Sequence, residues 1–371
     1  MSTTRVHIPT GIPTGIVSHG IVLARPFPPD RQGDPRPAKP QAAPPRPPAA
    51  PTGPAMQPAT SAYLGDHQLV VKPVWGGHVI VPTYNIDVAL GVARDRIIEP
   101  WTTRLVQELL RPGDVYLNAG ANFGYYVALG GGIVGIAGRV YGIEPNPHIF
   151  PFLMKTVYWN GTPKQTRLFR RALSNTQGTH LTFQFDPQYL GNGKAEHRHY
   201  AGGAAVPPAT QCATLPEAIW SAGNIDQLLD DDGRVVETKR LMVSFSAVTT
   251  TIDRICAAES TVSLIHLDIE GAEPFALAGA METIRRSPGI RLITEWSAEE
   301  HFQQASQQVR ELFLAFWKEM TERGYRVRHV EPRVADNGSL FLSQPLSLEA
   351  MTTHAAHGDY VWVGRETDPW G

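Results

Sequence analysis

Apolar and polar positions change their spacing several times along the chain, and each spacing predicts a kind of element. Short apolar runs typical of buried strands alternate with stretches that repeat apolar residues every three or four positions, as amphipathic helices do. Strands are predicted at residues 114–118, 139–143, 167–173, 262–269 and 290–296, and helices at 99–110, 147–159, 272–286 and 309–323. Because such alternation forms parallel sheets through right-handed crossovers, we expect an α/β fold with helices on both faces.

Other segments depart from this alternation. Two apolar runs on either side of Gly76 and Gly77 predict a hairpin over residues 69–83, and an alternating run at residues 179–185 predicts an extra strand. Further strands are expected at residues 241–248, 325–330, 340–342 and 360–363.

Two weaker patterns lie between these strands. Residues 249–257 predict a short helix, with Thr249 or Thr250 as its N-cap. Residues 186–240 combine Gly, Ala, Pro and acidic residues without a period, which indicates an insertion with little regular structure.

Proline divides the chain into two parts. Fifteen of its 32 prolines lie in residues 1–60, a segment of net charge +4, whereas the rest of the chain has a net charge of −6. Residues 26–58 have almost no large apolar side chain, so burial cannot offset chain entropy there. We expect a disordered, basic tail at residues 1–60, and one domain at residues 61–371 that begins with a hairpin and a helix at 61–113.

The tail has two interpretations. Residues 42–48 could be a ligand for a proline-binding module of a partner protein, or the tail could be a solvated tether, and the composition favours the tether.

Several functional classes conflict with the composition. A mildly acidic body argues against nucleic-acid binding by phosphate neutralisation, and no apolar run reaches the roughly 18 residues of a membrane span. The start of the chain lacks the pattern of a secretory signal. Two cysteines, Cys212 and Cys256, cannot form a disulfide framework or a cysteine-based zinc site. The cytoplasm is therefore the expected compartment.

A glycine-containing turn follows the first predicted core strand, in the sequence DVYLNAGANFGYY. Gly120 would permit a sharp turn, and Gly124 would permit close approach at the start of the next helix, whose free N–H groups can face a polar ligand. The spacing G-x-x-x-G is not that of a dinucleotide turn. A tight turn without any ligand is an equal alternative from this loop alone.

An acid ends the second core strand. Glu144 would lie beside the glycine turn, because the ends of neighbouring strands meet at the switch point of such sheets. There a carboxylate can accept hydrogen bonds from both ribose hydroxyls of a nucleoside. A solvated acid is the alternative, and Pro145 and Pro147, which hold the following loop, favour the functional interpretation.

Four blocks of the chain resemble the successive motifs of the FkbM family of S-adenosylmethionine-dependent methyltransferases: LNAGANFGYY, GRVYGIEPNPHIFPFL, RRALSN and IHLDIEGAEPFALAGA. The resemblance covers residues 99–296. It implies a Rossmann-like class I methyltransferase fold, with a seven-stranded, mostly parallel sheet that ends in an antiparallel hairpin. It also implies S-adenosylmethionine as the cofactor.

The resemblance also implies a pose for this cofactor. The turn from Gly120 through Asn122 to Gly124 would cradle the amino-acid end, and Glu144 would hold the ribose. Ala172 and Leu173 would border the adenine.

Two positions depart from the family pattern. Asn118 stands where the family usually has an Asp that binds the cofactor ammonium group, and an amide accepts without charge assistance. His266 stands where a Lys is frequent.

Three acids end the central strand. Alternation puts His266, Asp268 and Glu270 on one face, and an acid inside an apolar strand is costly unless it is paired or functional. Asp268 is the first candidate for a catalytic base or a metal ligand, Glu270 is the second, and Glu273 is interpreted as structural.

The next strand adds Glu295 to the same cleft. His301 follows as a further candidate base, although a solvated surface histidine is the preferred interpretation. A divalent ion at Asp268 with a second acid stays an open alternative. His180, His197 and His199 have no ligand spacing, so no metal site is assigned to them.

The leading hypothesis is an S-adenosylmethionine-dependent O-methyltransferase that acts on a hydroxyl of a sugar, a glycan or a secondary metabolite, with residues 186–240 as a lid or part of the acceptor pocket. A nicotinamide-dependent oxidoreductase is disfavoured, because a third glycine and a Tyr-x-x-x-Lys pair are missing. A cofactor-binding protein without activity is the non-enzymatic alternative, and Asn118 is its main support.

Overall fold

The computed structural model describes residues 60–186, 189–195, 243–366 and 368–370. These residues belong to one compact unit, Pro58–Gly371. The predicted proline-rich tail, apart from residue 60, and most of the predicted insertion lie outside the described residues, as do His197 and His199. No helix in the described ranges is both long and apolar enough to span a bilayer.

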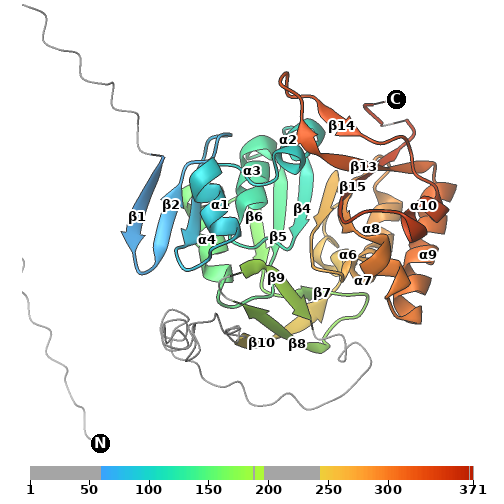
Figure 1. The fold of residues 1–371 in the computed structure, drawn as a ribbon, viewed down its shortest axis with the longest axis horizontal. Coiled ribbons are helices and arrows are strands. Elements are labelled where there is room, and N and C mark those ends of the chain that lie inside the picture. Colours follow the sequence, from blue (N-terminus) through green and yellow to red (C-terminus); the bar gives the residue numbers. More distant parts are fainter. Residues whose placement is uncertain (1–59, 187–188, 196–242, 367, 371) are drawn as a thin grey trace, which may run out of the picture. The chain divides into compact units, whose positions relative to one another are not determined.

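A single eight-stranded sheet forms the centre of the unit (Figure 1). Its strands, in spatial order, are β14 (Leu340–Leu342), β13 (Tyr325–Val334), β15 (Gly358–Gly364), β12 (Arg291–Trp296), β11 (Leu264–Leu267), β4 (Val115–Ala119), β5 (Arg139–Ile143) and β6 (Thr166–Phe169). The five strands from β12 to β6 are mutually parallel, whereas β15 is antiparallel to both of its neighbours. The predicted mostly parallel sheet is confirmed, and the short strand β14 extends it.

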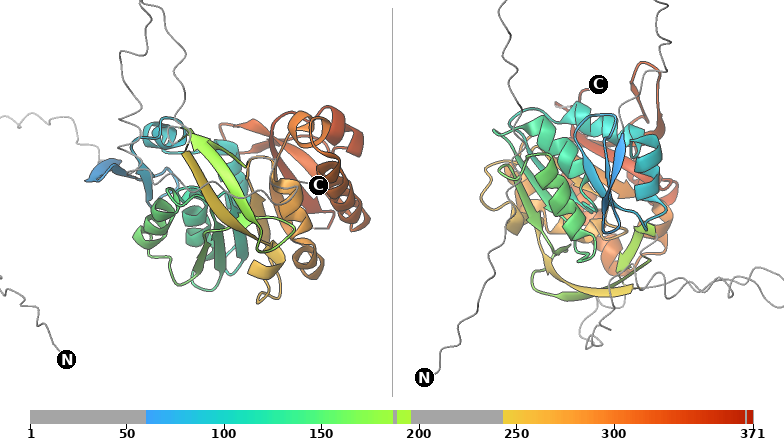
Figure 2. Two further views of the ribbon diagram at one scale, coloured as in Figure 1. Left: turned by 90° about the horizontal axis from the view of Figure 1, so that it is seen from below. Right: turned by 90° about the vertical axis from the view of Figure 1, so that its left-hand side faces the viewer.

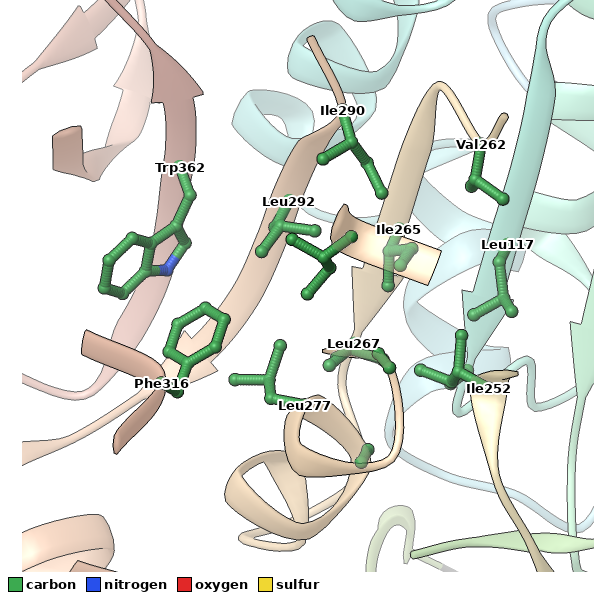
Figure 3. Packing of buried hydrophobic residues seen from close by; sticks show 14 of the residues in the cluster. Leu117, Ile252, Val262, Ile265, Leu267, Leu277, Ile290, Leu292, Phe316 and Trp362 are labelled. Atoms are coloured by element: carbon green, nitrogen blue, oxygen red, sulfur yellow. The ribbon is translucent and has the colours of Figure 1, made fainter. Parts of the chain in front are cut away.

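Helices cover both faces of this sheet, as predicted. On one face lie α2 (Pro100–Leu109), α3 (Tyr125–Val134) and α4 (Phe150–Trp159), and on the other lie α6 (Ile252–Ile255), α7 (Glu273–Ala278), α8 (Met281–Arg286) and α9 (Gln307–Glu322). Side chains alternate along β4, so that Tyr116 packs with α2 and α3 while Leu117 packs on the opposite face. Figure 3 shows Leu117, Ile265 and Leu292 following one another across β4, β11 and β12.

Two smaller sheets flank the main one. Strands β2 (Gln68–Val71) and β3 (Val79–Pro82) form the predicted hairpin, and β1 (Ser61–Gly65) adds a strand to it. The other sheet has the order β7 (Ala172–Leu173), β10 (Val243–Thr250), β8 (His180–Asp186) and β9 (Tyr189–Ala195). Because β7 follows β6 after two residues, this sheet lies at the carboxyl end of β6, below the main sheet in Figure 1 and in front of it in the left view of Figure 2.

Several sequence predictions about elements are wrong. The strand expected at residues 167–173 is divided between two sheets, because the chain leaves the main sheet after Phe169 and Ala172 pairs with β10. The helix expected at residues 272–286 breaks at Gly279, where a side chain would collide with the Ser174 carbonyl oxygen, 2.3 Å from the Cβ position.

The predicted cap and insertion also need correction. Thr249 and Thr250 end β10, and it is Thr251 whose side chain accepts the hydrogen bond from the Arg254 amide at the start of α6. Strand β9 lies inside the segment that was expected to lack regular structure, because it pairs with β8. Helices α1 (Val88–Asp95) and α10 (Leu348–Thr353) were not predicted.

Candidate functional site

The carboxyl ends of the central strands bring the predicted site residues to one edge of the sheet. Chain order reverses at β4, which has β5 on one side and β11 on the other, and ligands bind at such switch points. Asn118 is the direct neighbour of His266 across the β4–β11 pair. Glu144 follows β5, and Asp268 follows β11.

The turn after β4 requires glycine at its first position. Gly120 has a φ of 75°, and a Cβ there would lie 1.7 Å from the carbonyl oxygen of Asp268. The amides of Gly120 and Ala121 both donate to the carbonyl oxygen of Ile143, at 3.1 and 3.0 Å. The turn is therefore fastened to the end of β5 on one side and touches the end of β11 on the other.

Glu144 is buried, not solvated. Its two carboxylate oxygens accept hydrogen bonds from the amides of Asn122 and Asn146, each at 2.9 Å. Burial raises the pKa of Glu144 to about 7, and the two amide hydrogen bonds oppose that shift. Each carboxylate oxygen has a second lone pair, so the side chain can still accept hydrogen bonds from a ligand.

The remaining loop residues have structural contacts of their own. Asn122 has a φ of 47°, and its side chain accepts a hydrogen bond from the Phe123 amide at 2.9 Å. At Gly124 the space for a side chain is taken by Leu153 of α4, 2.8 Å from the Cβ position. The lack of a side chain at Gly124 therefore lets helix α4 pack closely against this turn.

Ala172 and Leu173 belong to β7 of the second sheet and not to a strand of the main sheet. Both are buried in β7, beside β10, and their side chains pack into two different apolar clusters. The structure therefore does not place them with Asn118 and Glu144 on neighbouring strands of one sheet.

Asn118 is buried, and its Oδ1 has no hydrogen-bond partner. Its Nδ2 lies 3.5 Å from Nδ1 of His266, which also lies 3.2 Å from the Tyr116 hydroxyl. Burial lowers the pKa of His266 to about 3, so the imidazole is neutral. The ring of His266 packs against Tyr126 with the centroids 4.8 Å apart. A buried acceptor of this kind is costly unless a ligand donates to it.

A cluster of acids follows the ends of β11 and β12. Its mutually interacting carboxylates are Glu99, Asp268, Glu270, Glu295 and Asp359. Burial and then the neighbouring charges, Glu295 first, hold the pKa of Asp268 well above its ordinary value. Burial, and then the charges of Glu273 and Glu270, raise the pKa of Glu295 to about 9, although its Oε1 lies 3.0 Å from Nε2 of His357.

Sequence reasoning missed two members of this cluster. Asp359 is the direct neighbour of Glu295 across the antiparallel β12–β15 pair, and it accepts hydrogen bonds from Trp101 and Thr102. Glu99 lies before α2 and accepts a hydrogen bond from the Tyr126 hydroxyl at 2.7 Å, while burial and then the charge of Asp359 raise its pKa to about 7. The sequence contains one weak indication of this cluster, because Asp359 is an acid at the start of an apolar run.

A buried pair ties the ends of β11 and β12 together. Glu273 accepts a hydrogen bond from the Ile269 amide at 2.8 Å, and its other oxygen lies 2.9 Å from Nε2 of His301. Nδ1 of His301 accepts from the Ser297 amide at 3.0 Å, so its Nε2 must carry the proton toward Glu273. The structural interpretation of Glu273 agrees with this geometry. The expectation of a solvated His301 is wrong, because the ring is 2% exposed.

Within the described part of the chain, no group of three or more His, Cys, Asp or Glu side chains is arranged to hold a metal ion.

Glu270 lies in the turn after β11 with a φ of 57°, next to Gly271 at 93°. The three predicted catalytic acids thus lie on two neighbouring strand ends.

The sequence model of the FkbM methyltransferase domain matches residues 118–327, more than half of the chain. A comparison with curated proteins found no match.

Among solved structures, an O-methyltransferase from Bacillus cereus in complex with SAH is 11% identical, with 76% of this chain and 82% of that chain covered and a TM-score of 0.34. The O-methyltransferase TomG from Streptomyces achromogenes is 10% identical, with coverages of 72% and 79% and a TM-score of 0.33. A SAM-dependent methyltransferase from Aquifex aeolicus is 13% identical, with coverages of 71% and 90% and a TM-score of 0.30. Likenesses this distant say nothing about the acceptor.

Proposed function

The chain belongs to the FkbM methyltransferase family, and we propose that it transfers the methyl group of S-adenosylmethionine to a hydroxyl of a sugar, a glycan or a secondary metabolite. One observation carries the proposal. An unpartnered buried acceptor, Asn118 Oδ1, and an acid of raised pKa, Asp268, belong to neighbouring strands at the switch point of the sheet.

The side chains on β4 and β5 fit the proposed cofactor. Asn118 Oδ1 would accept a hydrogen bond from the ammonium group, which would supply the missing donor. Glu144 would hold the ribose hydroxyls with its remaining lone pairs, while its two amide hydrogen bonds keep the carboxylate in place. When bound, S-adenosylmethionine supplies a methyl group activated by a positively charged sulfur.

Asp268 would act as the general base for the acceptor hydroxyl. A base works best when its pKa lies near the working pH, and burial together with the acid cluster raises the pKa of Asp268 toward that range. Glu295 and Glu270 would tune this pKa, because their charges disfavour a second negative charge nearby. Carboxylates also accept hydrogen bonds from hydroxyls, which supports a hydroxyl-bearing acceptor.

Calorimetry provides the first test. S-adenosylmethionine and its demethylated product should bind the full-length protein, whereas NAD should not. Glu144→Gln should weaken the binding of both sulfur nucleosides by about tenfold, because its NH2 group places a donor against one of the two backbone amides, Asn122 or Asn146, that the carboxylate accepts from. If neither sulfur nucleoside binds, the proposal fails.

The methyl acceptor has to be identified by experiment. Labelled S-adenosylmethionine added with fractionated cell extract should label a pool of small hydroxylated compounds. Nicotinamide chemistry would instead change the absorbance of NAD, and binding without transfer to any pool would indicate a cofactor-binding protein.

Once the acceptor is identified, Asp268→Asn should lower kcat by about 100-fold or more, because the base is lost. The affinity for the demethylated product should stay within about twofold, because Asp268 is not assigned to cofactor binding. Asp336→Asn, in an exposed turn, is the matched control and should leave both quantities unchanged. Full turnover in the Asp268 variant would remove this residue from the mechanism.

A further inference from the structure

A cavity lies beside the edge strand β6. It has a volume of about 530 Å³ and is bounded by the end of β6, the end of β10 and helix α6. None of the residues proposed for methyl transfer lines it, neither Asn118 nor Glu144 nor Asp268. Its volume lies within the range of about 300–1,000 Å³ that small-molecule sites occupy.

Three arginines surround this cavity: Arg170, Arg171 and Arg254. The first two lie at the corner where the chain leaves the main sheet for β7, and the third is on α6. All three are exposed, and none forms an ion pair with an acid in the described ranges.

The nearest acid in the sequence does not neutralise these arginines. Asp253 directs its two carboxylate oxygens to the amides of Glu282 and Thr283, at 3.2 and 2.6 Å. Arg171 Nη1 donates to the carbonyl oxygen of Arg170 at 3.0 Å, which fixes the corner and leaves its other N–H groups available. The cavity therefore concentrates positive charge on a body whose net charge is negative.

One part of the cavity wall is apolar, and it is formed by Leu168, Phe169, Val248 and Ile255. Phe169 stacks on Tyr141 with the centroids 6.3 Å apart, and Val248 and Ile255 complete the wall beside α6. An apolar wall next to several guanidinium groups suits a ligand that has an anionic group at one end and an apolar part at the other.

We propose that this cavity binds a phosphorylated small molecule, with the guanidinium groups on the phosphate and the apolar walls against the rest of the ligand. Guanidinium groups present forked N–H donors that match phosphate oxygens, and they stay charged at all physiological pH values. A phosphate monoester has three terminal oxygens, enough for each arginine to find an acceptor. The residues that line this cavity are not those proposed for methyl transfer, so the proposal does not rest on that function.

A ligand-detected NMR titration of the full-length protein with phenyl phosphate tests the proposal. Phenyl phosphate should bind more tightly than inorganic phosphate, because its ring can contact the apolar walls, and phenol should not bind. The double variant Arg170→Gln/Arg254→Gln should weaken phenyl phosphate binding by about tenfold or more, and Arg254→Gln alone should weaken it less.

Arg365→Gln is the matched control, because Arg365 is an exposed arginine that follows β15 and does not line the cavity. It should change the affinity by less than about twofold. Binding of the demethylated cofactor should be unchanged in the double variant, which separates this site from the methyl-transfer site.

Three outcomes would overturn the proposal. These are no binding of phenyl phosphate to the unaltered protein, an equal loss of affinity in Arg365→Gln, and equal affinities for phenyl phosphate and inorganic phosphate. Arginine-dependent binding of a single-stranded RNA in place of phenyl phosphate would also refute it, since the arginines would then serve a nucleic-acid surface.

Discussion

Asn118 is the residue whose surroundings most directly favour the proposed cofactor site. It occupies a fully paired central strand, yet its Oδ1 lacks a donor and its neighbour His266 is neutral. Without a ligand, a buried amide costs less folding free energy here than a buried carboxylate would, because an unpaired buried charge is far more costly than a buried dipole. The substitution seen in the sequence thus favours the empty protein over tight cofactor binding.

Asn118→Asp should lower the stability of the protein without cofactor and raise its affinity for S-adenosylmethionine. We expect the melting temperature without cofactor to fall by about 4 °C or more, and the affinity for S-adenosylmethionine to rise by about threefold to tenfold. Thermal unfolding with and without the cofactor measures both effects. Asn337→Asp, in an exposed turn, is the control and should do neither. An unchanged affinity would mean that Asn118 does not face the ammonium group.

At the scale of elements, the site depends on how closely β4 and β11 end beside each other. The Gly120 turn leaves no room for a methyl group against the Asp268 carbonyl, so the turn and the proposed base, Asp268, are held in one geometry. The Glu273–His301 pair likewise holds the ends of β11 and β12 in a fixed relative position. Position of the acids is therefore a property of strand ends, which suits a reaction that depends on alignment.

Gly120→Ala tests this close contact. Both a positive φ and a collision with Asp268 oppose the new methyl group, so the free energy of unfolding should fall by about 3 kcal/mol or more. Gly113→Ala is the matched control, since its φ is +90° but nothing lies within 4 Å of the Cβ position. It should cost only about 1 kcal/mol, which chemical denaturation can resolve. Equal losses would show that strain alone, without the contact, limits this turn.

Element prediction succeeded where one local pattern sufficed. The apolar run that became β5 matches its predicted bounds, and those that became β4 and β12 differ by a residue. It failed where a contact with a distant segment decided the outcome. Arg170 separates two strands because Ala172 pairs with Thr249, far along the chain, and the Gly279 break follows from the Ser174 carbonyl.

For the whole molecule, the acid cluster makes stability depend on pH. The pKa values of Glu99 and Glu144 rise to about 7 and that of Glu295 to about 9, each chiefly through burial. Between the ordinary value of 4.5 and these raised values, the folded state binds more protons than the unfolded state. The contribution of these groups to the free energy of unfolding must therefore decrease as pH rises through this window.

Without ligands, the melting temperature should fall as pH rises from about 5 to 9. Glu295→Gln should flatten the part of the curve between about pH 7 and 9, because it removes a carboxyl group whose pKa is about 9. Glu322→Gln is the control, since the Glu322 side chain is 65% exposed and should leave the curve unchanged. A melting temperature that rises over this window in the unaltered protein would contradict the proposed protonation of the cluster.

The sequence by itself determined the order of strands and helices, the glycine turn, the acids that end the central strands, and the family, because all of these are written in contiguous residues. Only the tertiary structure decided which acids meet. Glu99 and Asp359 join Asp268 and Glu295 because β15 pairs antiparallel with β12 and α2 packs beside it, and neither fact is encoded near those residues. Burial, which shifts their pKa values, likewise arises only when distant segments exclude water together.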